Sequence, residues 1–123
     1  MEIFKTLYRV YVNDIDEAIC FYQKLFDSKC GSIFKYDKAG LTIAQIGGIL
    51  IIGGAESALE PFKNTNITIL VDSVSEYKAF LLQNGAEIMS DIKEVPTGFN
   101  MTIRHKEGTI VEYVEHNSEI KEK

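Results

Sequence analysis

The chain has 123 residues, of which 46% are hydrophobic and 25% are charged, and this composition is typical of one globular domain with a single core. Its net charge of −5 disfavours nucleic acid as a partner, because an acidic chain gains nothing from releasing counterions from a phosphate backbone. No run approaches the roughly 18 apolar residues of a membrane helix, and the N-terminus lacks a signal-peptide pattern. We therefore expect a cytoplasmic protein that binds neither membranes nor nucleic acid, with Cys20 and Cys30 as reduced thiols rather than zinc ligands.

The first half of the chain predicts a strand, a helix and then three short strands. Residues 7–12 are rich in β-forming side chains and predict a strand. Asp14 followed by Glu17 matches a capping box, and apolar residues recur at helical spacing over 15–26. Turn residues, mostly glycine, separate the three strands that follow, which we expect at 32–36, 40–46 and 49–52.

The second half repeats this order of elements. Residues 67–71 predict a strand. Asp72 or Ser73 then offers a cap for a helix, and Gly85 suits the position just beyond the end of that helix. Three further strands are expected, at 87–93, 99–105 and 109–115.

The repeat predicts an α+β fold made of two βαβββ modules within one domain, 1–123. Glu17 and Glu76, for example, occupy the same place in the two halves and are 59 positions apart (76 − 17). A lone module would leave one face of its sheet uncovered, so we expect a curved mixed sheet around a cleft, with the helices on its convex face. The expected halves, linker and frayed tail are 5–54, 64–116, 55–63 and 117–123.

Strand parity predicts which side chains face the cleft. In the first strand Val10 and Val12 should face the helix, because helices need an apolar surface, and this leaves Arg9 and Tyr11 on the cleft side. In the matching strand of the second half, the same argument leaves three residues on the cleft side, namely Asn66, Thr68 and Leu70.

The last hairpin takes its register from its turn. Lys106-Glu107-Gly108 suits a type I turn followed by a glycine bulge, and in this register Thr102 opposes Glu112. Paired residues share a face, so Thr102, Arg104 and Glu112 lie on one face and His105 on the other. Both faces have mixed composition, and parity alone does not decide which one faces the cleft.

The opening and closing runs of the chain resemble those of the vicinal oxygen chelate superfamily, which includes glyoxalase I, extradiol dioxygenases, fosfomycin-resistance enzymes and bleomycin-resistance proteins. The opening run is Val10-Tyr11-Val12-Asn13-Asp14, and the closing run, 104–113, contains Glu112. The resemblance extends over residues 7–115. It implies the paired βαβββ fold and a homodimer, and it places Glu112 in the cleft, because the family's last strand usually carries a glutamate.

The resemblance also implies a divalent metal, held by residues of the first and last strands of each module. Glu112 matches one of these ligands. The other three positions fall on side chains that donate weakly or not at all, which are Leu7, Asn66 and either Ile52 or Gly53. One carboxylate does not hold a transition metal against water, since catalytic sites use about three protein ligands. We therefore expect no metal and no other cofactor, and we leave open a rearranged metal site that uses His105 or His116.

Three functional hypotheses follow. In the first, the protein binds a small molecule without a metal, as drug-sequestering members of the family do, and no residue is assigned a catalytic role. Its ligand-binding residues would be the polar groups of the cleft, namely Arg9, Tyr11, Asn66, Thr102, Arg104 and Glu112. An equally weighted interpretation, compatible with the first, is that Glu112 only pairs with Arg9 or Arg104.

The alternative is an enzyme: a metal-dependent lyase, isomerase or dioxygenase-like protein with Glu112 as a metal ligand, or a metal-free enzyme with Glu112 as general base. Nearby arginines would lower the pKa of Glu112, which argues against a general base. The third hypothesis is a domain that acts through protein partners.

Overall fold

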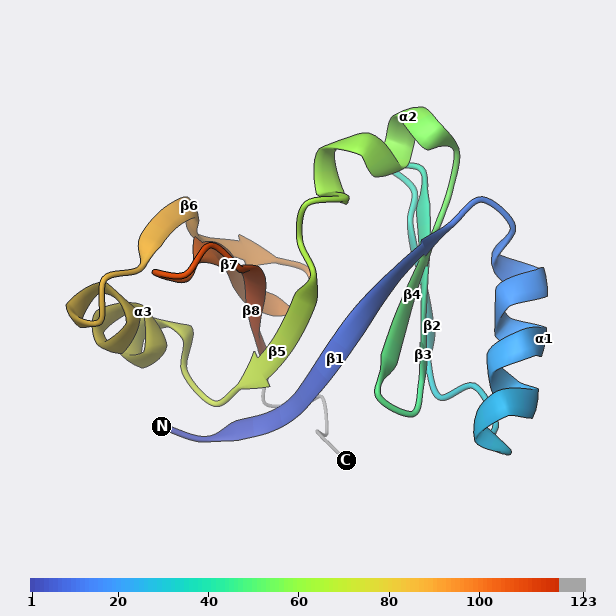
Figure 1. Cartoon of the computed structure of the whole chain (residues 1–123), viewed down its shortest axis with the longest axis horizontal. Coiled ribbons are helices and arrows are strands. Elements are labelled where there is room, and N and C mark those ends of the chain that lie inside the picture. The colour runs from blue at the N-terminus through green and yellow to red at the C-terminus, as the bar shows by residue number, and fades with distance from the viewer. Residues whose placement is uncertain (118–123) are drawn as a thin grey trace. The chain divides into compact units, whose positions relative to one another are not determined.

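The computed structural model describes residues 1–117, which form an α+β fold (Figure 1). The chain divides into two compact units. We call Leu7–Asn64 module A, and Met1–Thr6 together with the described residues from Thr65 onward module B. Of the tail predicted at 117–123, only Asn117 lies within the described residues. Its backbone and side-chain amides donate hydrogen bonds to the carbonyls of Thr97 and Pro96.

The first half follows the predicted order of elements. The strands and the helix are β1 (Ile3–Val12), α1 (Ile15–Phe26), β2 (Ile33–Tyr36), β3 (Leu41–Ile46) and β4 (Ile49–Gly53). β1 begins earlier than the predicted strand, because its first residues belong to module B, where the N–H of Asp72 donates to the carbonyl of Glu2. The segment predicted as a linker contains a short helix, α2 (Glu56–Leu59), and one turn of 3-10 helix, η1 (Glu60–Phe62).

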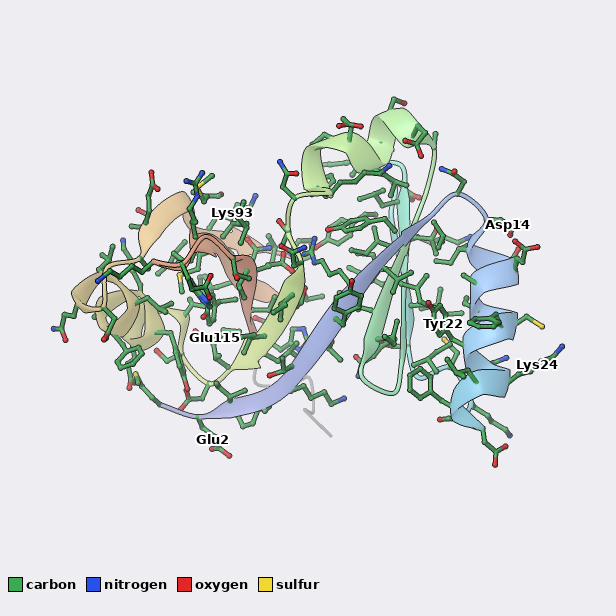
Figure 2. All side chains as sticks on the ribbon, viewed as in Figure 1. Glu2, Asp14, Tyr22, Lys24, Lys93 and Glu115 are labelled. Atoms are coloured by element: carbon green, nitrogen blue, oxygen red, sulfur yellow. The ribbon has the colours of Figure 1, made fainter. Side chains whose placement is uncertain are left out.

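α1 begins and ends as local chemistry dictates. The Asp14 carboxylate accepts a hydrogen bond from the N–H of Glu17 at 3.0 Å and so caps the first turn (Figure 2). Asp27 closes the helix in the left-handed conformation, with φ of 49°. α1 lies along β3 and β4 (Figure 1), and its apolar residues pack in one cluster with theirs. Val12 packs in this α1 cluster, whereas Tyr11 packs in a second cluster, so the predicted parity of β1 is confirmed.

The second half has the same order. Its elements are β5 (Ile67–Val71), α3 (Val74–Gln83), β6 (Glu87–Val95), β7 (Gly98–Arg104) and β8 (Ile110–His116). Ser73 rather than Asp72 caps α3, because the Ser73 hydroxyl accepts the N–H of Glu76 at 3.3 Å. Gly85 follows the helix with φ of +84°, in the left-handed region that favours glycine. The predicted hairpin register is confirmed, since Thr102 pairs with Glu112.

The strands form one hydrogen-bonded order, β2-β3-β4-β1-β5-β8-β7-β6. β1 runs parallel to β4, and β5 runs parallel to β8. The pairs β2–β3, β3–β4, β6–β7 and β7–β8 are antiparallel, so the sheet is mixed as expected.

The core of module B lies between α3 and one face of its strands. Val71, Met101 and Val111 from β5, β7 and β8 pack there with the helix residues Tyr77 and Leu81. Because neighbouring residues on a strand point to opposite faces, the other face of the same strands carries the residues in between. This packing decides what parity had left open. The face with Thr102 and Glu112 is the one that points away from α3.

Candidate functional site

A row of polar side chains crosses module B on the face opposite α3. The β5–β8 register pairs Thr68 with Glu112, and the β7–β8 register pairs Thr102 with the same glutamate. The Thr68 hydroxyl donates a hydrogen bond to a carboxylate oxygen of Glu112 at 3.2 Å. Thr68 is only 3% exposed, whereas Glu112 and Thr102 are half-buried. Glu112 is therefore a carboxylate held in place by a hydroxyl of the neighbouring strand.

The row continues onto β6 through a residue that the sequence did not indicate. Ser90 pairs with Thr102, with a register irregularity on each side of it. These irregularities explain why the sequence did not indicate Ser90, because the alternation of side chains along β6 cannot be extrapolated across a bulge. Thr68 was already expected on the cleft side from parity. Its bond to Glu112 became visible only once β5 and β8 were known to be neighbours.

Two other predicted site residues lie at the margin of this row. Arg104 is exposed and pairs across the strands with Glu87, with 3.8 Å between its Nη1 and a Glu87 carboxylate oxygen. Asn66 is exposed at the start of β5, where its backbone N–H donates to the carbonyl of Ile110. The exposed ion pair between Arg104 and Glu87 contributes little to stability, about 0–1 kcal/mol.

The remaining two predicted residues, Arg9 and Tyr11, lie together in module A. A guanidinium nitrogen of Arg9 donates to the Tyr11 hydroxyl at 2.9 Å. The Tyr11 hydroxyl in turn donates to the backbone carbonyl of Phe62 in η1. Arg9 is 8% exposed, which is unusual for a charged residue and requires polar partners. No local sequence signal marks the Phe62 carbonyl, because any residue supplies such an acceptor.

The surface around Tyr11 is apolar. Leu41, Ile52 and Leu59 form a buried cluster with which Tyr11 packs on the face of module A opposite α1. Module A thus combines an apolar cluster with the buried Arg9 cation and the Tyr11 phenol. Such a combination suits an organic ligand with a polar end.

The residues do not form the metal-ligand set that the family resemblance implies. The caps Asp14 and Ser73 are 59 positions apart (73 − 14), so Arg9 is the counterpart of Thr68 (68 − 59). Arg9 pairs with Leu50 on β4, just as Thr68 pairs with Glu112 on β8. The residue of the first half that corresponds to Glu112 is therefore Leu50. The predicted placement of this ligand position at Ile52 or Gly53 is wrong. A constant offset fails beyond the helix because the hairpins of the two halves differ in length.

The other ligand positions are equally unsuited to a metal. Leu7 is 2% exposed and has no donor atom, and Asn66 offers only a neutral amide oxygen. Among residues 1–117, no three side chains of the His, Cys, Asp and Glu types gather closely enough to hold a metal ion.

The two histidines occupy different environments. The Nε2 atom of His105 lies 2.7 Å from the Tyr113 hydroxyl, and Tyr113 belongs to the core cluster beneath α3. His105 thus points to the face opposite Glu112, as predicted. Burial raises the pKa of the Tyr113 phenol to about 12. His116 is half-buried at the end of β8, where it pairs with Gly98.

Comparison with solved structures relates this geometry to known proteins. An uncharacterised protein from Methanosarcina mazei is 45% identical, with a TM-score of 0.86, and the match covers 98% of each chain. Methylmalonyl-CoA epimerase from Mycobacterium tuberculosis is 15% identical with a TM-score of 0.73, covering 95% of this chain and 91% of that one. A methylmalonyl-CoA epimerase in complex with methylmalonyl-CoA and NH4+ is 14% identical with a TM-score of 0.70, covering 95% and 97%. No protein-family model and no curated protein matches the chain.

The fold and these neighbours define a protein of the paired βαβββ class. The chain belongs to the family of the Methanosarcina protein, and it shares its fold with methylmalonyl-CoA epimerases. The two epimerases share the fold at low identity, and that likeness alone transfers neither substrate nor catalytic residues.

Two further expectations concern the environment of the protein. Cys20 and Cys30 are both free thiols, the first exposed and the second half-buried. Within residues 1–117, no helix is both long and apolar enough to cross a membrane.

Proposed function

We propose that this protein binds a small organic molecule without the divalent metal typical of the superfamily's enzymes, and that it acts in the cytoplasm. The observation that carries the proposal is the setting of Glu112. Glu112 lies where the family resemblance predicts a metal-binding glutamate, and it accepts a hydrogen bond from Thr68 and stands in a row of hydroxyls. Carboxylates and hydroxyls in such a row recognise the donors and acceptors of an organic ligand.

The proposed contact residues form two groups that can be tested separately. On module B they are Thr102 and Glu112, with Arg104 and Asn66 at the margin. On module A they are Arg9 and Tyr11, beside the apolar cluster of Leu41, Ile52 and Leu59. An ion pair between Glu112 and an arginine would not exclude ligand binding, because a ligand can replace either partner.

A calorimetric metal titration decides between this proposal and its alternative, the metal-dependent lyase, isomerase or dioxygenase-like enzyme. Chelator-stripped protein is titrated with zinc, nickel, manganese and cobalt, in parallel with Glu112→Ala and Glu94→Ala. Glu94 is an exposed residue of β6, so its substitution is a control for the loss of one negative charge. We expect no binding tighter than about 1 mM, or about −4 kcal/mol.

Tight stoichiometric metal binding that Glu112→Ala abolishes and Glu94→Ala preserves would refute the metal-free proposal. It would favour the enzyme, and His116 would be the next residue to replace. His105 would follow, because its ring nitrogen already contacts Tyr113.

The ligand is sought by thermal unfolding in the presence of a panel of small molecules. The panel includes methylmalonyl-CoA, the ligand of one of the epimerase structures, together with drug-like and aromatic compounds. A ligand at about 100 times its Kd should stabilise the protein by about 2.7 kcal/mol. Glu112→Ala, Tyr11→Phe or both should weaken this stabilisation. A ligand that stabilises all variants equally would show that the binding residues are misassigned.

The family resemblance also supports a homodimer, which we propose as the state in solution. Large apolar side chains are exposed on module A, with Phe21 and Leu25 on α1 at 57% and 61% exposure and Ile33 on the edge strand β2 at 57%. Exposed apolar groups of this size are common at interfaces between protein chains. Sedimentation equilibrium tests the proposal, and a monomer mass at high micromolar concentration would contradict it.

A further inference from the structure

The segment that follows β4 closes over one face of its own module. Residues 55–64 contain α2 and η1, and Leu59 at the end of α2 is only 1% exposed. Leu59 packs against Leu41 and Ile52, on the apolar face opposite α1. The segment thus covers the surface beside Tyr11 that the proposed function assigns to a ligand.

An ion pair joins the two ends of the segment. The Lys63 ammonium lies 2.9 Å from the Glu56 carboxylate, so the beginning and the end of the segment are held together. This contact, with a further hydrogen bond from Asn13, lowers the pKa of the Glu56 carboxyl. The Lys63–Glu56 contact lies within the segment, whereas Asn13 joins the beginning of the segment to the end of β1.

Tightly packed glycines mark the point where the segment leaves the sheet. A Cβ atom at Gly53 would lie 2.7 Å from the Cβ of Ile15, and one at Gly54 would lie 2.8 Å from the carbonyl oxygen of Gly40. The N–H of Gly54 also donates to the carbonyl of Val12 at 3.1 Å. This end of the segment is therefore anchored to the sheet.

The far end is held by a side chain of the proposed site. The Tyr11 hydroxyl donates to the Phe62 carbonyl, and the buried Arg9 guanidinium donates to the same hydroxyl at 2.9 Å. A cationic donor polarises the phenol and strengthens the bond that the phenol donates. Arg9 and Tyr11 thus serve two purposes, since the bond that secures the segment uses the groups that a ligand would contact.

We propose that residues 55–64 form a lid on module A, which is anchored to the sheet at Gly53 and Gly54 and is latched by the bond from the Tyr11 hydroxyl to the Phe62 carbonyl. A ligand that takes over the Tyr11 hydroxyl releases the lid. This last step rests on the proposed function, whereas the latch itself does not.

The latch is tested without any ligand, by limited digestion with trypsin. Lys63 lies at the end of the lid, so cleavage after Lys63 reports opening, provided that the lid closes faster than the enzyme cuts. We compare the wild type with Tyr11→Phe and Tyr8→Phe. Tyr8 is on the same strand, 60% exposed and on the opposite face, so Tyr8→Phe is a control for the loss of a phenol hydroxyl. Cleavage after Lys24 in α1 reports unfolding of the module as a whole.

Tyr11→Phe should raise the rate of cleavage after Lys63 about fivefold, the change in open population that corresponds to about 1 kcal/mol for one hydrogen bond. Tyr8→Phe should leave the rate of cleavage after Lys63 unchanged. In Tyr11→Phe, the rate of cleavage after Lys24 should stay at the wild-type value. An unchanged rate in Tyr11→Phe would overturn the latch. A parallel rise after Lys24 would do the same, because the hydroxyl would then stabilise the whole module.

Hydrogen exchange of the wild-type protein provides a second measurement that needs no variant. The N–H of Leu59 donates to the carbonyl of Ala55 at 3.0 Å, and it should exchange through local opening that low denaturant does not accelerate. Exchange of this amide only through global unfolding would refute the lid. A failed ligand search would leave both results standing, and failure of the latch would leave ligand binding at Glu112 untouched.

Discussion

Removing the buried hydroxyl of Tyr113 should change the free energy of unfolding in opposite directions at moderate and at high pH. Tyr113 is 4% exposed, stacks on Tyr77 with ring centroids 6.0 Å apart, and lies 2.7 Å from His105 Nε2. Tyr113→Phe removes the hydroxyl and keeps the ring. Near pH 9 the variant should be less stable than the wild type by about 1 kcal/mol, the typical net contribution of one hydrogen bond.

At higher pH the order should reverse. Burial, followed by the nearby Tyr77, raises the pKa of Tyr113 from 10.0 to about 12. The unfolded chain therefore loses this proton near pH 10, while the folded chain keeps it until about pH 12. A raised folded-state pKa contributes stability that is complete below pH 10 and is lost as pH rises toward 12. By pH 11.5 the wild type should have lost about 2 kcal/mol that the variant, with no group to titrate there, retains.

The assay is urea unfolding of both proteins at several pH values between 9 and 11.5, followed by circular dichroism. Other tyrosines and lysines titrate in this range in both proteins, so the difference in the free energy of unfolding isolates Tyr113. We expect the difference to pass from about 1 kcal/mol in favour of the wild type to about 1 kcal/mol in favour of Tyr113→Phe. A difference that stays constant with pH would show that the phenol ionises in the folded protein as it does in water.

Two further predictions concern the backbone and the surface of module B. Gly98→Ala should cost more than about 3 kcal/mol or prevent folding, because φ is +147° and a Cβ would lie 2.0 Å from the carbonyl oxygen of Glu115; Gly48→Ala, with nothing within 4 Å of its Cβ, should unfold at nearly the wild-type urea concentration. The hydrogen bond from Lys78 lowers the pKa of Asp91, so Asp91→Asn should destabilise the protein slightly at neutral pH and lose this effect as pH falls through the lowered pKa. An Asp91→Asn effect that persists at pH 2 would contradict the ion pair as its cause.

Local chemistry was sufficient to predict most of the elements. α1 was predicted from its apolar period and from Asp14, and the last hairpin from the turn at 106–108, because caps and tight turns depend on residues that are near one another in sequence. The segment 55–64 was predicted only as a linker. Its helix α2 has no side-chain cap and is secured by Leu59 packing on the sheet, a tertiary contact that no local pattern indicates.

The sequence by itself determined the repeated βαβββ order, the two faces of β1 and the register of the last hairpin. Each of these follows from periodicity or from a short motif. Only the tertiary structure decided that Thr68 bonds to Glu112, that Leu50 is the counterpart of Glu112, and that Tyr11 secures Phe62. The physical reason is the same in all three cases. These contacts depend on which strands and segments become neighbours and in what register, and this is determined by packing over the whole chain.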